Sequence, residues 1–344
     1  MKKTEDEEHA YLWDGSGEPD PEVVRLETLL GQLRHRGMPP AFPGQHPRTR
    51  RSRTWVVVGA LAIAALVVLM ANIGWHVVGS LGGAWNVQTI TGTPIVDGTR
   101  AAAQTAAARL RTGGWVETDA VSRARIAVGD IGRVDVEPNT RVQMVEASGR
   151  AHRMSLARGT IHARIWAPPK LFFVNTPSAT AIDLGCEYTL QVDDGGAGQI
   201  RVALGWVSLE GNGRASYIPE GAVGATRPGA GPGTPYYDDA PSGYGEALEV
   251  IDFGSENDPR RADAFNLVIS SARRLDAFTL WHLLTRGTLA ERRRVYDRLA
   301  TLVPPPGRAT RDAILQGDRQ ALDQWWDSLG LGTTTWWKLW KSEF

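Results

Sequence analysis

An uncharged apolar run preceded by a cluster of arginines constrains this chain more than any other feature of its sequence. Residues 55–78 contain no Asp, Glu, Lys or Arg, and four arginines lie between residues 48 and 53. As a helix rising about 1.5 Å per residue, the run would span roughly 36 Å, enough to cross a hydrocarbon core of about 30 Å. Buried helices of globular proteins rarely run so long without a charge. We therefore predict one transmembrane helix at residues 55–78.

The arginine cluster also predicts the orientation of the chain, because Lys and Arg accumulate on the cytoplasmic side of a membrane helix. A cleaved signal peptide fits poorly, since its apolar part is about 7–15 residues long and follows a short basic start. A twin-arginine signal at Arg50-Arg51 also fits poorly, because polar residues 52–54 follow it. We expect a single-pass protein of the cell inner membrane, with residues 1–54 in the cytoplasm and the C-terminus in the periplasm.

Charge and cysteine content limit the partners and cofactors of the chain. It has 38 basic and 38 acidic residues, so no strongly basic surface indicates direct binding of nucleic acid. Cys186 is the only cysteine, which rules out an internal disulfide and a cysteine-rich zinc site. We expect neither a cofactor nor a metal ion.

The cytoplasmic segment contains one amphipathic helix that lacks an apolar partner within the segment. Asp20 and Pro21 form a helix start, and Pro39 prevents continuation. The helix either binds a protein groove or rests on the bilayer as a passive tail. The first interpretation is favoured, because a bilayer-bound helix usually has a basic polar face, whereas residues 1–36 hold nine acids against five Lys or Arg. The predicted partner-binding residues, at helical spacing, are Val23, Leu26, Leu30 and Leu33.

The sequence from residue 85 to about residue 227 alternates between apolar and polar positions with a period of two. Turn residues such as Gly129-Asp130 and Gly195-Gly196 separate the alternating runs. Short strands at nearly regular spacing predict an all-β domain, either a sandwich or a solenoid-like stack. The predicted inward-facing positions include Ile126, Val128, Val134, Val136, Val142, Met144, Met154, Leu156, Ile161, Ala163, Ile165, Phe172, Val174, Ile182, Leu184, Leu190, Val192, Ile200, Val202 and Leu204.

Six ordered blocks in this region resemble the conserved blocks of FecR-type domains. They lie at residues 111–118, 138–140, 156–161, 174–177, 184–188 and 202–207, and the resemblance spans residues 88–225. Members of this family are typically bacterial single-pass regulators with a periplasmic sensing domain and a cytoplasmic anti-sigma segment. The resemblance therefore implies signal transduction and transcription regulation through an extracytoplasmic-function sigma factor. The resemblance also implies two partners: the sigma factor in the cytoplasm, and a periplasmic or outer-membrane protein outside.

Composition divides the outside part into three stretches. Residues 79–226 form the FecR-like β domain, residues 227–245 a Pro/Gly linker, and residues 246–344 a small helical C-terminal domain. Within the last stretch Thr288 and Glu291 form a capping box for a helix. Its tryptophans either fill a small core or form a partner surface. That possible partner surface consists of Trp336, Trp337 and Trp340.

The sequence does not indicate an enzyme. Ser155, His152 and Asp135 are present, but no nucleophile elbow, metal triad or carboxylate pair stands out from the strand pattern. We expect no catalytic, cofactor-binding or metal-binding residues. The alternative to sigma-factor control is an envelope-anchored module that binds the cell wall or a protein partner. The apolar stripe of the cytoplasmic helix favours the regulator, because a passive anchor needs no such stripe.

Overall fold

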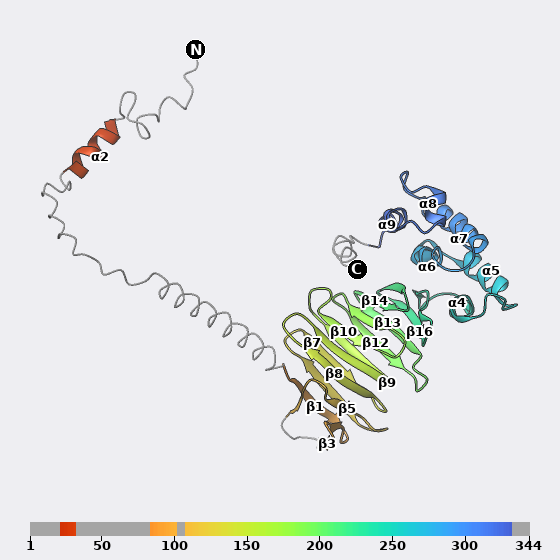
Figure 1. Ribbon diagram of the computed structural model, residues 1–344, viewed down its shortest axis with the longest axis horizontal. Helices are drawn as coiled ribbons and strands as arrows, with labels where there is room; N and C mark the ends of the chain where they lie inside the picture. The colour runs from red at the N-terminus through yellow and green to blue at the C-terminus, as the bar shows by residue number, and fades with distance from the viewer. Residues whose placement is uncertain (1–20, 32–82, 102–106, 332–344) are drawn as a thin grey trace, which may run out of the picture. The chain divides into compact units, whose positions relative to one another are not determined.

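A computed structural model describes residues 21–31, 83–101 and 107–331 of the chain. The chain divides into two compact units, Met1–Leu69 and Met70–Phe344. The described element of the first unit is helix α2 (Pro21–Gly31). The second unit is a β domain followed by short helices (Figure 1). The prediction of a mainly β chain with a C-terminal helical region is confirmed.

The predicted transmembrane helix at residues 55–78 lies outside the described residues. Within the described ranges, no helix combines the length and the apolar character needed to cross a membrane. The single-pass topology and the inner-membrane location stay predictions.

The strands of the second unit form two sheets. They are β1 (Trp85–Thr91), β2 (Ile95–Val96), β3 (Thr99–Arg100), β4 (Ala108–Leu110), β5 (Trp115–Glu117), β6 (Arg123–Val128), β7 (Gly132–Val136), β8 (Arg141–Ala147), β9 (His152–Ile165), β10 (Phe172–Asn175), β11 (Thr180–Asp183), β12 (Glu187–Val192), β13 (Gly198–Leu204), β14 (Trp206–Gly211), β15 (Arg214–Pro219), β16 (Ala222–Arg227), β17 (Gly231–Pro232) and β18 (Tyr236–Tyr237). The first sheet has the order β4-β1-β6-β7-β9-β12-β13-β16, and both β17 and β18 pair with β16. The second has the order β3-β2-β5-β8-β9-β10-β11-β14-β15.

Strand β9 is long because it belongs to both sheets. Up to Arg158 it pairs with β8 and β10, and from Gly159 it pairs with β12 and then β7. Gly159 has a φ of +95°, and a Cβ at this position would lie 2.4 Å from the Cα of Thr140. Only glycine accepts both this conformation and this close approach, so it allows the strand to pass from one sheet into the other.

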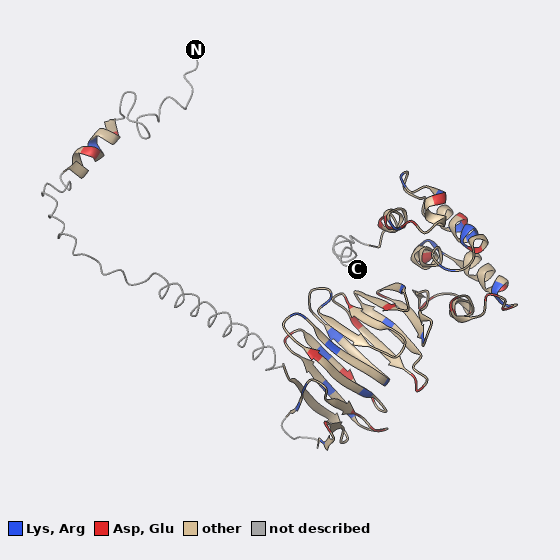
Figure 2. Cartoon of the chain, viewed as in Figure 1, with Lys and Arg blue, Asp and Glu red and all other residues tan. Residues whose placement is uncertain are grey.

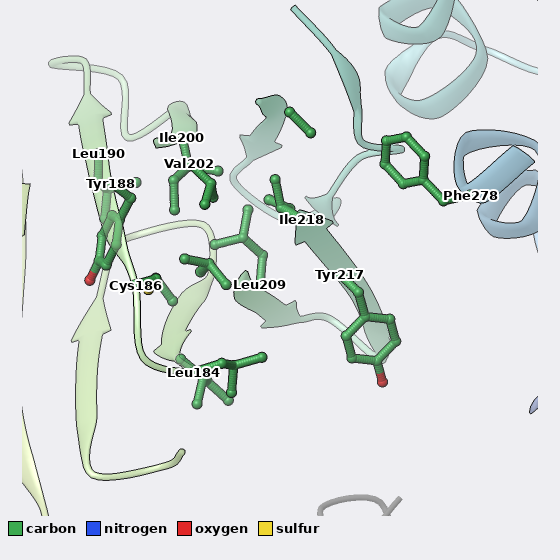
Figure 3. Packing of buried hydrophobic residues seen from close by; sticks show 14 of the residues in the cluster. Leu184, Cys186, Tyr188, Leu190, Ile200, Val202, Leu209, Tyr217, Ile218 and Phe278 are labelled. Atoms are coloured by element: carbon green, nitrogen blue, oxygen red, sulfur yellow. The ribbon is translucent and has the colours of Figure 1, made fainter. Parts of the chain in front are cut away.

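The two sheets enclose a common hydrophobic core, which the predicted inward-facing residues fill. Leu190 and Ile200 of the first sheet and Leu209 and Ile218 of the second are all buried, and Figure 3 shows how they pack. Alternate side chains of a strand point to opposite faces, so a period of two places one apolar set in this core.

Leu204 is an exception, and the prediction that it faces inward is wrong. Its side chain is 54% exposed. The pairing of β12 with β13 shifts register between Glu187 and Tyr188, and Leu204 lies opposite Glu187 beyond that shift. A bulge of this kind moves the following side chain to the other face of the sheet.

The helices that follow the strands are short and share the core of the β domain. They are α4 (Tyr244–Phe253), α5 (Arg261–Ser271), the 3₁₀ helix η2 (Arg274–Asp276), α6 (Ala277–Leu283), α7 (Leu289–Leu302), α8 (Arg311–Leu315) and α9 (Arg319–Asp327). The predicted capping box is confirmed, because the Thr288 side chain accepts from the Glu291 N–H and the Glu291 carboxylate accepts from the Thr288 N–H. Trp281, Trp325 and Trp326 are buried in the core of this region.

The stretch expected to be a linker, residues 227–245, is packed into the unit. It includes β17 and β18, and residues 231–235 are buried. A Cβ at Gly231, where φ is +77°, would lie 2.5 Å from the carbonyl oxygen of Gly211. The glycine therefore permits a close strand contact rather than a flexible connection. The other predicted domain boundaries stay predictions.

Charged residues of both signs lie on neighbouring strands of the first sheet (Figure 2), and several of them form ion pairs. The Nε of Arg125 lies 2.5 Å from Oδ1 of Asp135, and Arg164 pairs with Glu187 on the neighbouring strands. These side chains are about one third or more exposed, and exposed pairs contribute roughly 0–1 kcal/mol each. We interpret this face as a solvated surface with balanced charge.

Candidate interaction sites

Helix α2 presents apolar side chains that no described residue covers. Leu26 is 57% exposed and Leu30 is 62% exposed, and no residue of the helix is buried. Val23 lies on the same side of the helix, because positions 23, 26 and 30 follow the helical repeat, and its side chain is half-buried. Leu33, the fourth predicted residue of this face, lies outside the described residues. Leucines exposed at this spacing are suited to the apolar groove of a partner protein.

A second candidate site lies where the helices meet the second sheet, and it is organised by Arg286 between α6 and α7. Nη1 of Arg286 donates to Oδ1 of Asp252 at 2.8 Å and to Oγ1 of Thr234 at 2.7 Å. Nη2 donates to Oγ of Ser216 at 2.8 Å. The side chains of Arg286 and Asp252 are 7% and 2% exposed. We call these four residues the Arg286 network.

Further polar atoms of the Arg286 network have partners as well. The Thr234 N–H donates to Oδ2 of Asp252 at 2.6 Å, and the Ser216 hydroxyl donates to the Gly233 carbonyl at 2.7 Å. The network thus connects β15, the segment after β17, α4 and the end of α6 through one buried ion pair. A buried ion pair with satisfied hydrogen bonds fixes the relative position of the elements that carry it.

His282 closes the edge of the second sheet beside the Arg286 network. Strand β15 pairs with β14 alone among the described strands. The backbone N–H of Tyr217 on β15 donates to Nε2 of His282 at 3.0 Å, and Nδ1 lies 2.7 Å from the Phe278 carbonyl. Nε2 must accept while Nδ1 donates, so His282 is a neutral imidazole with its proton on Nδ1. The Tyr217 N–H could otherwise pair with a strand of another chain, and its hydrogen bond to His282 prevents this.

A cavity of about 580 Å³ opens next to His282, and we call it the junction cavity. Tyr217, Trp281 and His282 give it aromatic walls, and Leu322 of α9 adds an apolar one. Its charged lining consists of Glu210, Asp323, Arg214, Arg286 and Arg319. Aromatic walls with a few charges of both signs suit a peptide that carries aromatic and charged side chains.

Cys186 is buried beside the carboxyl group of Asp183, whose pKa is raised. Its Sγ donates to Oδ2 of Asp183 at 2.7 Å, and the Gly185 N–H donates to Oδ1 of the same carboxyl at 2.7 Å. Burial raises the pKa of Asp183 to about 7. Burial and the neighbouring carboxyl also raise the pKa of the Cys186 thiol. A thiol held in its protonated form is a structural group rather than a reactive one.

We predict that Asp183→Asn removes a measurable pH dependence from the stability of the chain. A folded pKa of about 7 lies above the usual value near 3.9, so the folded state holds its proton in a window where the unfolded state releases it. The stability contributed by the protonated form is full below about pH 4 and is lost as the pH rises to about 7, by roughly 1.4 kcal/mol per unit. Urea unfolding at pH 4.5, 5.5 and 6.5 measures this slope.

The control for this prediction is Asp193→Asn, a change in an exposed turn that should leave the slope of the wild-type chain unaltered. Equal slopes for the wild-type and Asp183→Asn chains would contradict the raised pKa.

The residues considered for catalysis are not brought together. The His152 ring lies against Trp85 with centroids 6.1 Å apart, and burial lowers its pKa. Asp135 pairs with Arg125 on the other sheet, and Ser155 of β9 lies opposite Asn175. Among the described residues, no group of His, Cys, Asp and Glu is arranged to hold a metal ion.

The sequence predicted α2 but missed the Arg286 network, whose members lie far apart in the chain. Trp336, Trp337 and Trp340, the possible partner surface, lie outside the described residues.

Comparison with known proteins finds one family match within the β domain. Residues 115–208, from β5 into β14, match the family model described as FecR protein. Two crystal structures of a candidate anti-sigma factor from Parabacteroides distasonis, at 1.65 Å and 2.50 Å resolution, are similar at 13% identity with a TM-score of 0.33. Each match covers 39% of this chain, and 63% or 62% of the other. No curated protein matches the chain. The expected resemblance to FecR-type domains is confirmed.

Proposed function

We propose that this chain, in which residues 115–208 match the FecR family, is a transmembrane regulator of an extracytoplasmic-function sigma factor. Helix α2 binds the sigma factor in the cytoplasm. Residues 55–78 anchor the chain in the inner membrane, and the unit that contains the FecR domain receives a signal in the periplasm. The FecR match favours this regulatory role over an enzymatic one.

The exposed apolar face of α2 is the observation that carries the proposal. Leu26 and Leu30 are more than half exposed in a segment that precedes the arginine-flanked apolar run. A helix of this length is marginal alone in water, and burial of its apolar face in a partner would stabilise it. A wall-binding anchor gives no physical reason for such a face. A tail resting on the bilayer would use one, but its polar face would usually be basic, and residues 1–36 hold nine acids against five Lys or Arg.

The signal-receiving role of the second unit is supported by its internal connections. The Arg286 network and His282 tie the helices to the outer strands of the β domain. A ligand or partner that binds near this junction would act on both parts at once, because they share buried polar contacts.

Expression of the intact chain in its bacterial host tests the proposal. Depletion and overexpression should change transcription of one sigma-factor regulon in opposite directions. A chain lacking residues 21–33 should remain in the membrane fraction and lose this effect, because it keeps the anchor and lacks the binding helix.

Topology reporters supply the control in the same host. Fusions at residue 45 should report the cytoplasm, and fusions at residues 120 and 300 should report the periplasm. Activity of a periplasm-only reporter at residue 45 would overturn the proposed orientation. Unchanged regulons with intact membrane attachment would instead favour the envelope-anchored binding module.

A further inference from the structure

We propose that the C-terminal segment, residues 332–344, docks into the junction cavity of its own chain through its tryptophan side chains. The segment carries Trp336, Trp337 and Trp340 together with Lys338 and Lys341. The proposal is independent of sigma-factor control, since it concerns the second unit alone.

The shape of the junction cavity fits indole side chains. Its volume of about 580 Å³ lies within the range of roughly 300–1,000 Å³ that is usual for sites that enclose compact ligands. Tyr217, Trp281, His282 and Leu322 are among its lining residues. Aromatic rings bury large areas and gain from edge-to-face contacts with other rings.

Neighbouring contacts show how an indole packs in this region. The rings of Trp281 and Trp326 meet edge to face with centroids 4.6 Å apart. Tyr217 contacts Trp326 in the same manner at 5.8 Å. Further indoles entering the junction cavity would extend an existing aromatic cluster rather than create a new kind of contact.

Two acidic side chains of the cavity can receive the lysines of the C-terminal segment. Glu210 and Asp323 line the cavity, and both are partly buried. Arg214, Arg286 and Arg319 line it as well, and Arg286 is already paired with Asp252. Burial raises the pKa of Glu210, so an ammonium group placed beside it would stabilise its charged form. The segment thus offers indoles to aromatic walls, and a lysine placed at Glu210 or Asp323 would meet a carboxylate.

Chain connectivity favours residues 332–344 as the occupant of the junction cavity. The cavity is partly lined by Leu322 of α9, and this helix ends at Asp327. Residues 332–344 can span at most about 43–47 Å when extended. Leu322 lies about 8 Å back along α9 from Asp327, at about 1.5 Å per helical residue, so the segment is long enough to return to it. A tethered segment also acts at an effective concentration near millimolar, which favours it over a free partner of equal affinity.

A labelled peptide tests this docking on the full-length chain in detergent micelles. The probe is a fluorescein-labelled peptide with the sequence of residues 332–344. It should bind the full-length W336A/W337A/W340A variant, whose own segment lacks the indoles. It should bind the wild-type chain at least tenfold more weakly, because the tethered segment already occupies the cavity.

Two substitutions with matched chemistry locate the binding site. Ala215 is an exposed residue of β15 that lines the cavity, so Ala215→Arg in the W336A/W337A/W340A chain should weaken peptide binding at least tenfold. Ala203→Arg, at an exposed position of β13, should leave binding unchanged. A peptide with alanine at the three tryptophan positions should not bind.

Several outcomes would overturn the proposal. Equal peptide binding by the wild-type and W336A/W337A/W340A chains, or no binding by either, would rule out a tethered occupant. An unchanged affinity after Ala215→Arg would place the segment elsewhere. If light scattering showed dimers that require the tryptophans, a second copy of the chain would be the occupant instead.

Discussion

Arg286→Met should lower the free energy of unfolding by about 3–5 kcal/mol. The substitution keeps most of the apolar stem but leaves the carboxylate of Asp252, which is 2% exposed, without its cation. The hydroxyl groups of Thr234 and Ser216 lose a hydrogen-bond donor at the same time. Uncompensated burial of a charge is among the costliest single changes in a protein. Urea unfolding of the full-length chain, followed by tryptophan fluorescence, measures the loss.

Arg260→Met is the matched control for the Arg286 prediction. Its ion pair with Asp258 has a similar distance of 2.8 Å, but the Arg260 side chain is 73% exposed. We expect a change of roughly 0–1 kcal/mol, because water replaces the lost partner. Asp252→Asn should recover part of the stability of Arg286→Met, since the amide retains an acceptor for the Thr234 N–H and removes the buried charge. A loss as small as that of the control would show that the Arg286 network does not hold the junction.

Replacing Leu26 and Leu30 together by Asp should weaken binding of the proposed sigma factor by roughly two to four orders of magnitude. Burial of two leucines contributes about 3–6 kcal/mol, and each factor of ten corresponds to about 1.4 kcal/mol. The new carboxylates add a desolvation cost inside an apolar groove. Titration of the purified full-length chain with the sigma factor whose regulon responds to it measures the loss.

Val24→Asp is the control for the two leucine changes. Val24 is 44% exposed and lies in the same helix, but the helical repeat directs it away from Leu26 and Leu30. An acid in the first turn of a helix is also compatible with the helix dipole, so α2 should persist. We expect this change to alter affinity mainly through association rate and salt dependence. Equal losses for both variants would contradict a binding face centred on the two leucines.

The strand pattern was predictable because it depends on local geometry. Alternate side chains of any strand point to opposite faces, so residues such as Ile126 and Val128 identify a core face without knowledge of the partner strand. Leu204 does not follow this alternation, because a register shift in the pairing of β13 with β12 turns its side chain to the outer face of the sheet. The capping box of Thr288 and Glu291 was predictable for a related reason, since its two residues are three positions apart.

The role of the Pro/Gly-rich stretch at residues 227–245 was not predictable from composition. Glycine and proline indicate turns and close approaches of the backbone, but they do not indicate whether a turn packs against the rest of the domain. Here Gly231 passes close to Gly211, and Thr234 binds Asp252. These contacts convert an expected linker into part of the sheet and of the Arg286 network.

The sequence by itself determined the β domain, its resemblance to FecR-type domains, the helical region after it and the apolar stripe of α2, because each depends on spacing within short stretches. Only the tertiary structure revealed the Arg286 network, the neutral His282 and the junction cavity. Arg286 meets its partners across separations of 34 to 70 residues. The sequence does not indicate whether a given arginine is solvated or buried in the folded chain. Its effect on stability depends on the groups that folding places around it and on the water that folding removes.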